Sequence, residues 1–508
     1  MSIGNTGISS SYKVPRYIAK IMNAGGAVSG ASQRLKCLLV GKKTSAGAMA
    51  LDDVPIKCTD VDFLDAQAGP GSQLAMMGYA ALSIPNVDLY IQAITEPGGG
   101  TKATVTMVIT GTWTTAGTLR FRIAGREVQV SVTATNSIDE VGAAIVLAIN
   151  ANQRLPVTAA YDGTGTTDTV TITTKNKGAN EKDWILYYDP TDAPSGIAFA
   201  ITGSASLNTN GVRFGASSSG TGAEDVTTCL TKLTKTRYAR IAIGHNDSTN
   251  TALWETHLSN KAGPLSLLLD QLLVGHNGTK AQAIAVGQTN LNAFRASVMF
   301  DRNSENHPCE VAALIAAARS VQEQANPIFD WDGYLLEYLR PQAFEADMLS
   351  DTEQNDCLNA GVTPLATVDG VSRIVRMITS YCVSNAVQDE RCLDIGDITM
   401  TDFATLDIKL MYETDFRPQN PIVGPDPSPE EEPPPAGVAY PKLWNAKVAT
   451  RLKSYKDAGW LVFEPTGIWA PVSTFNKVGG FIATETPLPV SRLQHRLDNV
   501  MRQIATVG

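Results

Sequence analysis

A threonine-rich stretch in the first half of the chain restricts the possible folds more than any other feature. Twenty Thr lie between Thr101 and Thr202, and apolar residues alternate with polar ones over 119–123 and 128–132. A period of two is typical of strands that have one buried and one solvated face. Because Gly-rich segments flank the stretch, we predict a β-rich inserted domain at 97–206.

One helix interrupts this β pattern. Ser137 and Glu140 have the spacing of a capping box, and Val141 and Ile145 follow on one helical face. Pro156 prevents the helix from continuing. The insert is therefore expected to be strands with a single helix.

The segments on either side alternate between strand-like and helix-like patterns. Before the insert we expect a buried strand at 35–41 and a helix at 74–82 capped by Ser72. After it we expect a strand at 239–244, a helix at 249–261, a strand at 283–287, a helix at 310–324 and a strand at 373–381. Such alternation predicts an α/β core built from 25–96 and 207–417.

The remaining parts differ from this core. Residues 418–441 hold nine Pro and an acidic run, so we predict an extended, solvated linker that joins no core. Residues 436–508 carry nine Lys or Arg against four Asp or Glu, although the whole chain has a net charge of −9. This asymmetry predicts that the C-terminal domain, 442–508, meets an acidic partner surface. Residues 1–24 are expected to form an N-terminal arm.

No arrangement of residues predicts catalysis. The run around Ser217 lacks the second Gly of a nucleophile elbow, and Lys36 stands where a phosphate-binding loop ending at Gly41–Thr44 needs its first Gly. Four of the five His have no metal-binding motif around them: His245, His257, His276 and His307. We therefore predict no catalytic, cofactor-binding or metal-binding residue.

Charge and hydropathy bear on partners and compartment. An acidic chain lacks the clustered cations that displace phosphate counterions, so no nucleic-acid partner is expected. The longest apolar stretch, 265–274, falls short of the ~20 residues of a membrane span, and residues 1–17 have no secretory signal. Seven Cys without a CxxC pair indicate buried thiols in a reducing compartment.

Short motifs occur in a fixed order between 33 and 400. They are Gln33–Gly41, Gly69–Met77, Gly117–Leu119, Ile123–Gly125, Ile149–Asn150, Leu155–Val157, Val170–Gly178, Pro308–Ala313, Ala325–Pro327, Gly361–Leu365 and Ile374–Tyr381. Taken together, and in this order, they resemble the tail sheath family of contractile phages, in its Mu-like branch. The order carries the resemblance, since no single motif is specific.

The resemblance implies a structural protein and no enzyme, with a subtilisin-like α/β middle domain that lacks a catalytic triad. It implies a helical homo-oligomer of stacked hexameric rings around a tail tube protein, in contact with baseplate and tail terminator proteins, with no cofactor and no membrane insertion. The location would be the virion tail, assembled in the host bacterial cytoplasm, and contraction would drive the tube through a cell envelope. Two alternatives stay open: another tail or baseplate component, or an α/β hydrolase-like enzyme.

Two sets of contact residues are expected. Inter-subunit arms would use the apolar residues near the chain ends, which are Tyr12, Val14, Tyr17, Ile18, Ile21, Val500, Ile504 and Val507. A basic helical segment would face the acidic tube through Lys447, Arg451, Lys453 and Lys456, each in a weak, salt-screened contact. We expect the insert to project outward, so that deletion of 101–204 still permits assembly.

Overall fold

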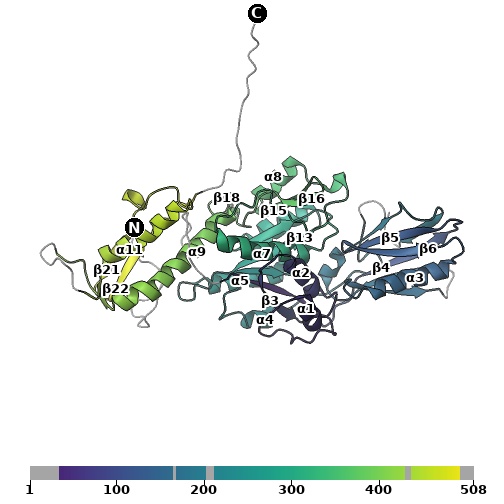
Figure 1. Cartoon of the computed structure of the whole chain (residues 1–508), viewed down its shortest axis with the longest axis horizontal. Helices are drawn as coiled ribbons and strands as arrows, with labels where there is room; N and C mark the ends of the chain where they lie inside the picture. The colour runs from purple at the N-terminus through teal and green to yellow at the C-terminus, as the bar shows by residue number, and fades with distance from the viewer. Residues whose placement is uncertain (1–33, 164–167, 202–206, 208–210, 429–435, 492–508) are drawn as a thin grey trace, which may run out of the picture.

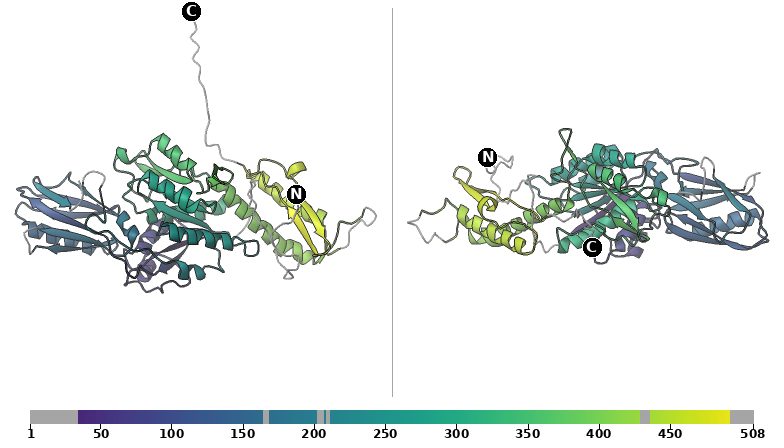
Figure 2. Two further views of the ribbon diagram at one scale, coloured as in Figure 1. Left: turned by 180° about the vertical axis from the view of Figure 1, so that it is seen from behind. Right: turned by 90° about the horizontal axis from the view of Figure 1, so that it is seen from above.

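A computed structural model describes residues 34–163, 168–201, 207, 211–428 and 436–491. They form three parts in a row along the longest axis of the molecule (Figures 1 and 2). The insert lies at one end, the central sheet with its helices in the middle, and a smaller C-terminal unit at the other end. No helix in the described part is long and apolar enough to cross a lipid bilayer.

Eight strands form the central sheet, in the order β16-β15-β14-β13-β12-β1-β3-β2. Six are parallel: β1 Lys36–Lys42, β3 Asp88–Ile94, β12 Arg240–Ile243, β13 Gln271–His276, β14 Ala296–Phe300 and β15 Val362–Val368. The edge strands β2 Ile56–Lys57 and β16 Val371–Ile374 are antiparallel to their neighbours. The inner strands are buried without alternation, as expected for a parallel sheet covered on both faces.

Helices cover both faces of this sheet. One face carries α1 Val61–Ala68, α2 Gln73–Leu82 and α7 Pro308–Ala325; the other carries α4 Thr227–Thr231, α5 Ser248–Lys261, α6 Lys280–Ile284 and α8 Asp351–Asn359. Successive residues of β1 point to opposite faces, so Leu39 joins one apolar cluster and Leu38 and Val40 join the other. The mixed α/β architecture and the helices expected at 74–82, 249–261 and 310–324 are confirmed.

The insert consists of two four-stranded antiparallel sheets. One holds β10 Ile197–Ile201, β4 Thr104–Gly111, β8 Thr169–Thr174 and β7 Val157–Asp162; the other holds β11 Val212–Arg213, β9 Ile185–Asp189, β5 Gly117–Ile123 and β6 Arg126–Val132. Helix α3, Ile138–Ala151, begins at the predicted Ser137–Glu140 capping box. The chain enters and leaves the insert side by side, because Thr101 and Thr221 form a β-bridge.

The C-terminal unit is built on two long helices, α9 Ile395–Met411 and α11 Pro441–Asp457, with a hairpin of β21 Val472–Asn476 and β22 Phe481–Glu485. It has an apolar cluster of its own, which includes Ala404, Ile408, Trp444 and Leu452. Helix α9 also reaches back to the central sheet, so it links the two parts (Figure 1).

Three expectations about local structure are wrong in part. The strand predicted at 283–287 is helical, because Thr279 and Gln282 form a capping box and α6 continues into a π-helix, Ala285–Leu291. A run of four apolar residues followed by Gly cannot by itself distinguish strand from helix. The strand predicted at 373–381 ends at Ile374, after which Thr379 N donates to the carbonyl of Leu393 and Ser380 N to the carbonyl of Ala296 at the start of β14.

The predicted linker at 418–441 contributes to the C-terminal unit at both of its ends. Strand β19, Ile422–Val423, pairs in parallel with β20, Val438–Ala439, and Ala439 is buried in the cluster of that unit. The composition argument failed here because residues 422–424 and 436–440 contain no Pro and keep their backbone donors. Residues 429–435 lie outside the described residues.

Candidate functional site at the two edges of the central sheet

An open parallel sheet has one preferred place for a ligand. This is the crevice beyond the carboxyl ends of the strands, at the point where successive connections run in opposite directions. Here that point lies between β1 and β12, because β1 pairs with β3 on one side and with β12 on the other. The crevice there is filled by side chains of the insert.

Lys42, the last residue of β1, is fully buried at this point. Its ammonium lies 2.8 Å from the carboxylate of Glu181 and 2.7 Å from that of Glu224, and it donates to the carbonyl of Lys177. Burial alone would lower the pKa of Lys42, but the two carboxylates outweigh it and raise the pKa above its usual range. Lys42 is thus committed to internal partners and forms no phosphate cradle with Gly41.

The start of α2, where an anion could bind a helix N-terminus, is also occupied. Ser72 caps the helix by accepting from Ala75 N, and Gln73 N donates to Asn176 Oδ1 of the insert at 2.8 Å. Gln73 Nε2 donates to the carbonyl of Gly244, just beyond β12. Two of the amide donors at this helix start, Gln73 N and Ala75 N, are therefore already bonded within the chain.

The histidines near this edge are packing residues. The His307 ring stacks on Trp184 of the insert with ring centroids 3.9 Å apart, and burial lowers its pKa to about 3. His245 accepts from Trp254 Nε1, and His276 stacks on Phe300. Burial lowers the pKa of His257 and of His276 to about 4. Neutral rings held by aromatic neighbours are what a structural role requires.

The candidate nucleophile Ser217 is not joined to any of these rings. Its hydroxyl accepts from Thr106 N at 2.7 Å, at the base of the insert. In the ranges that the structure describes, no group of three or more His, Cys, Asp or Glu could hold a metal ion.

Further charged contacts fix the insert to the core. Arg122 binds Glu305 through two nitrogens at 2.6–3.2 Å, and Arg126 lies 2.8 Å from the buried carboxylate of Glu310. Arg213 donates to Asn277 Oδ1 at 2.9 Å. The apolar cluster on this side is continuous from the sheet into the insert. Insert and core therefore form one packed body.

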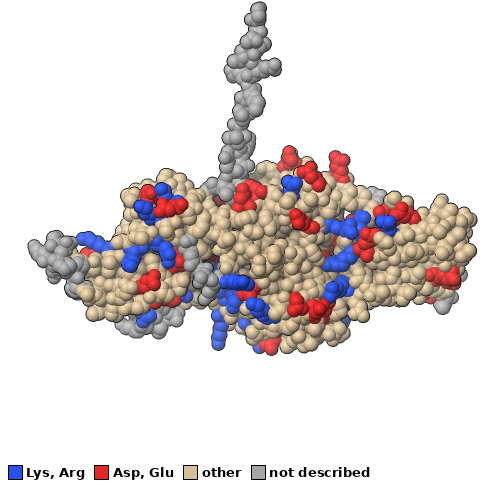
Figure 3. Space-filling view, in the orientation of Figure 1, with Lys and Arg blue, Asp and Glu red and all other residues tan. Residues whose placement is uncertain are grey.

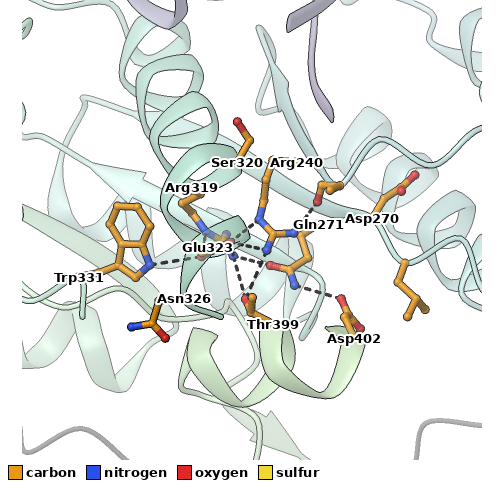
Figure 4. A network of polar contacts seen from close by, with 12 residues as sticks. Arg240, Asp270, Gln271, Arg319, Ser320, Glu323, Asn326, Trp331, Thr399 and Asp402 are labelled. Atoms are coloured by element: carbon orange, nitrogen blue, oxygen red, sulfur yellow. Dashed lines mark hydrogen bonds and ion pairs between the residues drawn. The ribbon is translucent and has the colours of Figure 1, made fainter. Parts of the chain in front are cut away.

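The opposite, amino edge of the sheet holds a buried polar network (Figure 4). Its centre is Glu323 of α7. The Glu323 carboxylate accepts hydrogen bonds at 2.6 Å from Arg240 Nε, at the start of β12, and from Arg319 Nε, and a third from Trp331 Nε1. Burial lowers the pKa of Arg319 to about 10. Such groups are retained in a core only where every charge has a partner.

Helix α9 joins this network from outside the sheet. Asp402 accepts from both terminal nitrogens of Arg295, at 2.8 and 3.0 Å, and from Gln271 Nε2 at 3.1 Å. Thr399, one helical turn earlier, lies within hydrogen-bond distance of Arg240 and Arg319. Sequence reasoning missed these residues, although an Arg and a Glu inside the Ala-rich pattern of α7 were a signal of buried charge.

The chain has a relative of known type at the level of sequence. No family model matches the chain. The tail sheath protein of the Mu-like prophage FluMu, from Haemophilus influenzae, is 26% identical over 394 residues, which is 77% of this chain and 76% of that protein. The resemblance to a Mu-like tail sheath protein is confirmed.

Solved structures align along most of the chain at low identity. The sheath tail protein of Desulfitobacterium hafniense is 11% identical with a TM-score of 0.45, covering 91% of this chain and 93% of that one. The sheath tail protein of Listeria innocua is 10% identical with a TM-score of 0.47, covering 90% and 93%.

The residues predicted to face a tube divide into two pairs on α11. Lys447 and Lys453 are exposed and point outward. Arg451 lies 2.9 Å from the fully buried carboxylate of Asp407 on α9, and Lys456 lies 2.8 Å from Glu464. Figure 3 shows Lys and Arg side chains on the visible face of this unit. Arg451 is thus engaged inside the unit, while Lys447 and Lys453 stay candidates for an outer contact.

The predicted arm residues Tyr12, Val14, Tyr17, Ile18 and Ile21, together with Val500, Ile504 and Val507, lie outside the described residues. Their role stays a prediction.

Proposed function

We propose that this chain is the structural subunit of a contractile tail sheath. The observation that carries the proposal is the sequence relationship to the Haemophilus influenzae prophage sheath protein, which extends over three quarters of both chains. The proposed role is mechanical, and the chain is not an enzyme.

The assembly that we propose is a helical stack of hexameric rings around a tail tube protein, bounded by baseplate and terminator proteins. It would be built in the host bacterial cytoplasm in a long, metastable form and would shorten in the virion tail to drive the tube through a cell envelope. Such a device is a switch between two packings held behind a kinetic barrier, so it needs no cofactor.

The two edges of the central sheet support a mechanical role. At the carboxyl edge, Lys42, Glu181 and Asn176 fill the place where an α/β enzyme of this type would bind its substrate. At the amino edge, α9 covers the ends of the strands through Asp402. This filling agrees with a subtilisin-like middle domain that carries no triad, and it weighs against the alternative of a hydrolase-like enzyme.

Surfaces for self-association are proposed on the C-terminal unit. Apolar side chains there lie open to solvent, with Val462 52%, Ile468 83% and Val478 95% exposed. Exposed apolar groups of this kind are typical of contact sites, and the occupant that we propose is a second copy of the chain. The arms at the chain ends would add extended segments to neighbouring copies. Lys447 and Lys453 would face the tube.

Electron microscopy of the purified full-length chain tests the proposal. Long helical sleeves, formed alone or on added tail tube protein, are the expected result. Short rings that never stack would favour the alternative of a baseplate or other tail component. Monodisperse protein that labels at Ser217 with a serine-directed activity probe would favour the hydrolase-like alternative.

A further inference from the structure

The two apolar cores that α9 connects meet at a layer of charge. The cluster of the C-terminal unit includes Met400, Ala404 and Ile408 of α9 and is separate from both clusters of the central sheet. Between them lie the buried side chains of the polar network, which are Arg240, Gln271, Arg295, Arg319, Glu323, Thr399 and Asp402. The contact between the two parts is therefore mainly polar and directional, with Ile395 of α9 in the cluster of the sheet and Ile328 packed on the cluster of the C-terminal unit as its apolar margin.

Two of the buried carboxylates of α9, Asp402 and Asp407, contact different parts of the molecule. Asp402 is held by the Arg295 fork and by Gln271, all from the sheet side, with the Arg295 and Asp402 side chains 5% and 3% exposed. Asp407, five residues later, accepts from Tyr455 Oη and lies beside Arg451, both from α11. The helix is thus anchored at two points along its length by different partners.

We propose that the Arg295–Asp402 clamp is a release joint, which holds the C-terminal unit at one angle to the core and can open without unfolding either part. The physical reason lies in the kind of contact. A bidentate, buried ion pair fixes one geometry and has no weaker intermediate, since a half-open pair leaves both charges buried without partners. Two apolar surfaces can slide past each other in small steps. The Arg295–Asp402 ion pair has only two favourable states, because it is either fully formed or fully separated and solvated.

Each part keeps its own support when the joint opens. The C-terminal unit retains the Leu452 and Trp444 cluster and the Asp407 anchor, while the sheet retains Glu323 between Arg240 and Arg319. Opening would expose Arg295 and Asp402 to water, where each charge is readily solvated. The joint is a property of the single chain and does not depend on the sheath proposal. In a sheath, which rests on the proposed function, it would let the C-terminal unit keep its lattice contacts while the core turns.

Hydrogen–deuterium exchange of the unassembled full-length chain tests the joint, with Asp402→Asn as the variant. Asn has nearly the same shape but leaves Arg295 without a counter-charge. We expect exchange in the first two turns of α9, 395–402, to accelerate by on the order of 100-fold, while β13 and α11 keep their protection. Small-angle scattering of the same variant should show a wider distribution of the longest dimension.

The matched control is Asp407→Asn, which removes the other carboxylate of the same helix. We expect it to accelerate exchange in α11 and to leave 395–402 unchanged. Unchanged exchange at 395–402 in Asp402→Asn would overturn the proposal. Equal acceleration in α9, β13 and α11 would overturn it too, because the clamp would then belong to one cooperative core. Neither outcome bears on whether the chain forms sleeves.

Discussion

The two edges of the central sheet are covered in different ways. The carboxyl edge is covered by the insert, whose apolar core runs without a break into that of the sheet and whose ion pairs include Lys42–Glu181 and Arg126–Glu310. The amino edge is covered by α9 through a polar layer around Asp402, with a separate apolar cluster beyond it. The insert and the sheet therefore share one continuous apolar core. The C-terminal unit instead has its own core and contacts the sheet through a polar layer.

The largest expected effect comes from removing the insert. Deletion of 101–204 with a short Gly/Ser bridge takes away Glu181 and Arg126, so Lys42 keeps only Glu224 and Glu310 loses its cation, and it uncovers the apolar cluster that runs from the sheet into the insert. We expect loss of soluble, cooperatively folding protein, since the shared apolar cluster becomes exposed and the loss of a partner from a buried ion pair costs about 3–5 kcal/mol. Soluble yield and thermal unfolding measure this.

This expectation reverses the one drawn from the sequence, which treated the insert as an outward projection that the assembly could lose. A deletion variant that unfolds at the temperature of the intact chain and still forms sleeves would contradict a shared core of insert and sheet. It would support the expectation that the insert is a dispensable outward projection.

The next effect concerns the ion triad at the carboxyl edge. Lys42→Met leaves the carboxylates of Glu181 and Glu224 facing each other without their cation. We expect the free energy of unfolding to fall by about 3–5 kcal/mol at pH 7, measured by urea denaturation. The matched control is Lys43→Met, next in the chain, whose ammonium bonds only the carbonyl of Gly47 and whose loss should cost about 1 kcal/mol. Equal losses of unfolding free energy in both variants would show that the Lys42–Glu181–Glu224 triad does not contribute specifically to stability.

A smaller, pH-dependent effect is expected at Asp301, which follows β14 at the same edge. Burial raises the pKa of its carboxyl to about 6, so this group favours folding fully below pH ~4 and loses that contribution as the pH rises through 6. Asp301→Asn should therefore stabilise the chain by about 1–3 kcal/mol at pH 7.5 and by nearly nothing at pH 4. Urea denaturation at both values checks it, with the exposed Glu413→Gln as the control. A gain that is the same at both pH values would rule out the titration.

Features that depend on residues close together in the chain could be predicted from the sequence, whereas contacts between distant residues could not. The Ser137–Glu140 capping box and the alternation over 119–123 involve neighbours in the chain, and the structure confirms both. The prediction of a strand at 283–287 failed because a run of four apolar residues fits either a strand or a helix. The pairing of buried charges was beyond reach for a different reason. Arg295 and Asp402 are 107 residues apart, so only the fold brings them together.

The smallest expected effect on the chain itself is at Lys447 and Lys453, the exposed pair on the jointed unit. Changing both to Glu should alter the free energy of unfolding by no more than about 0.5 kcal/mol, because neither forms an ion pair with another described residue and both face solvent. Assembly on tail tube protein should respond more strongly. With each surface contact contributing up to about 1 kcal/mol, sleeve formation should need roughly tenfold more protein at low salt. The difference should shrink at high salt as the charges are screened.

The matched control changes Lys102 and Lys235, two exposed lysines elsewhere, to Glu, which makes the same change in net charge. If both double variants weaken assembly equally, net charge and not this face of α11 is responsible, and the unit meets the tube through some other surface.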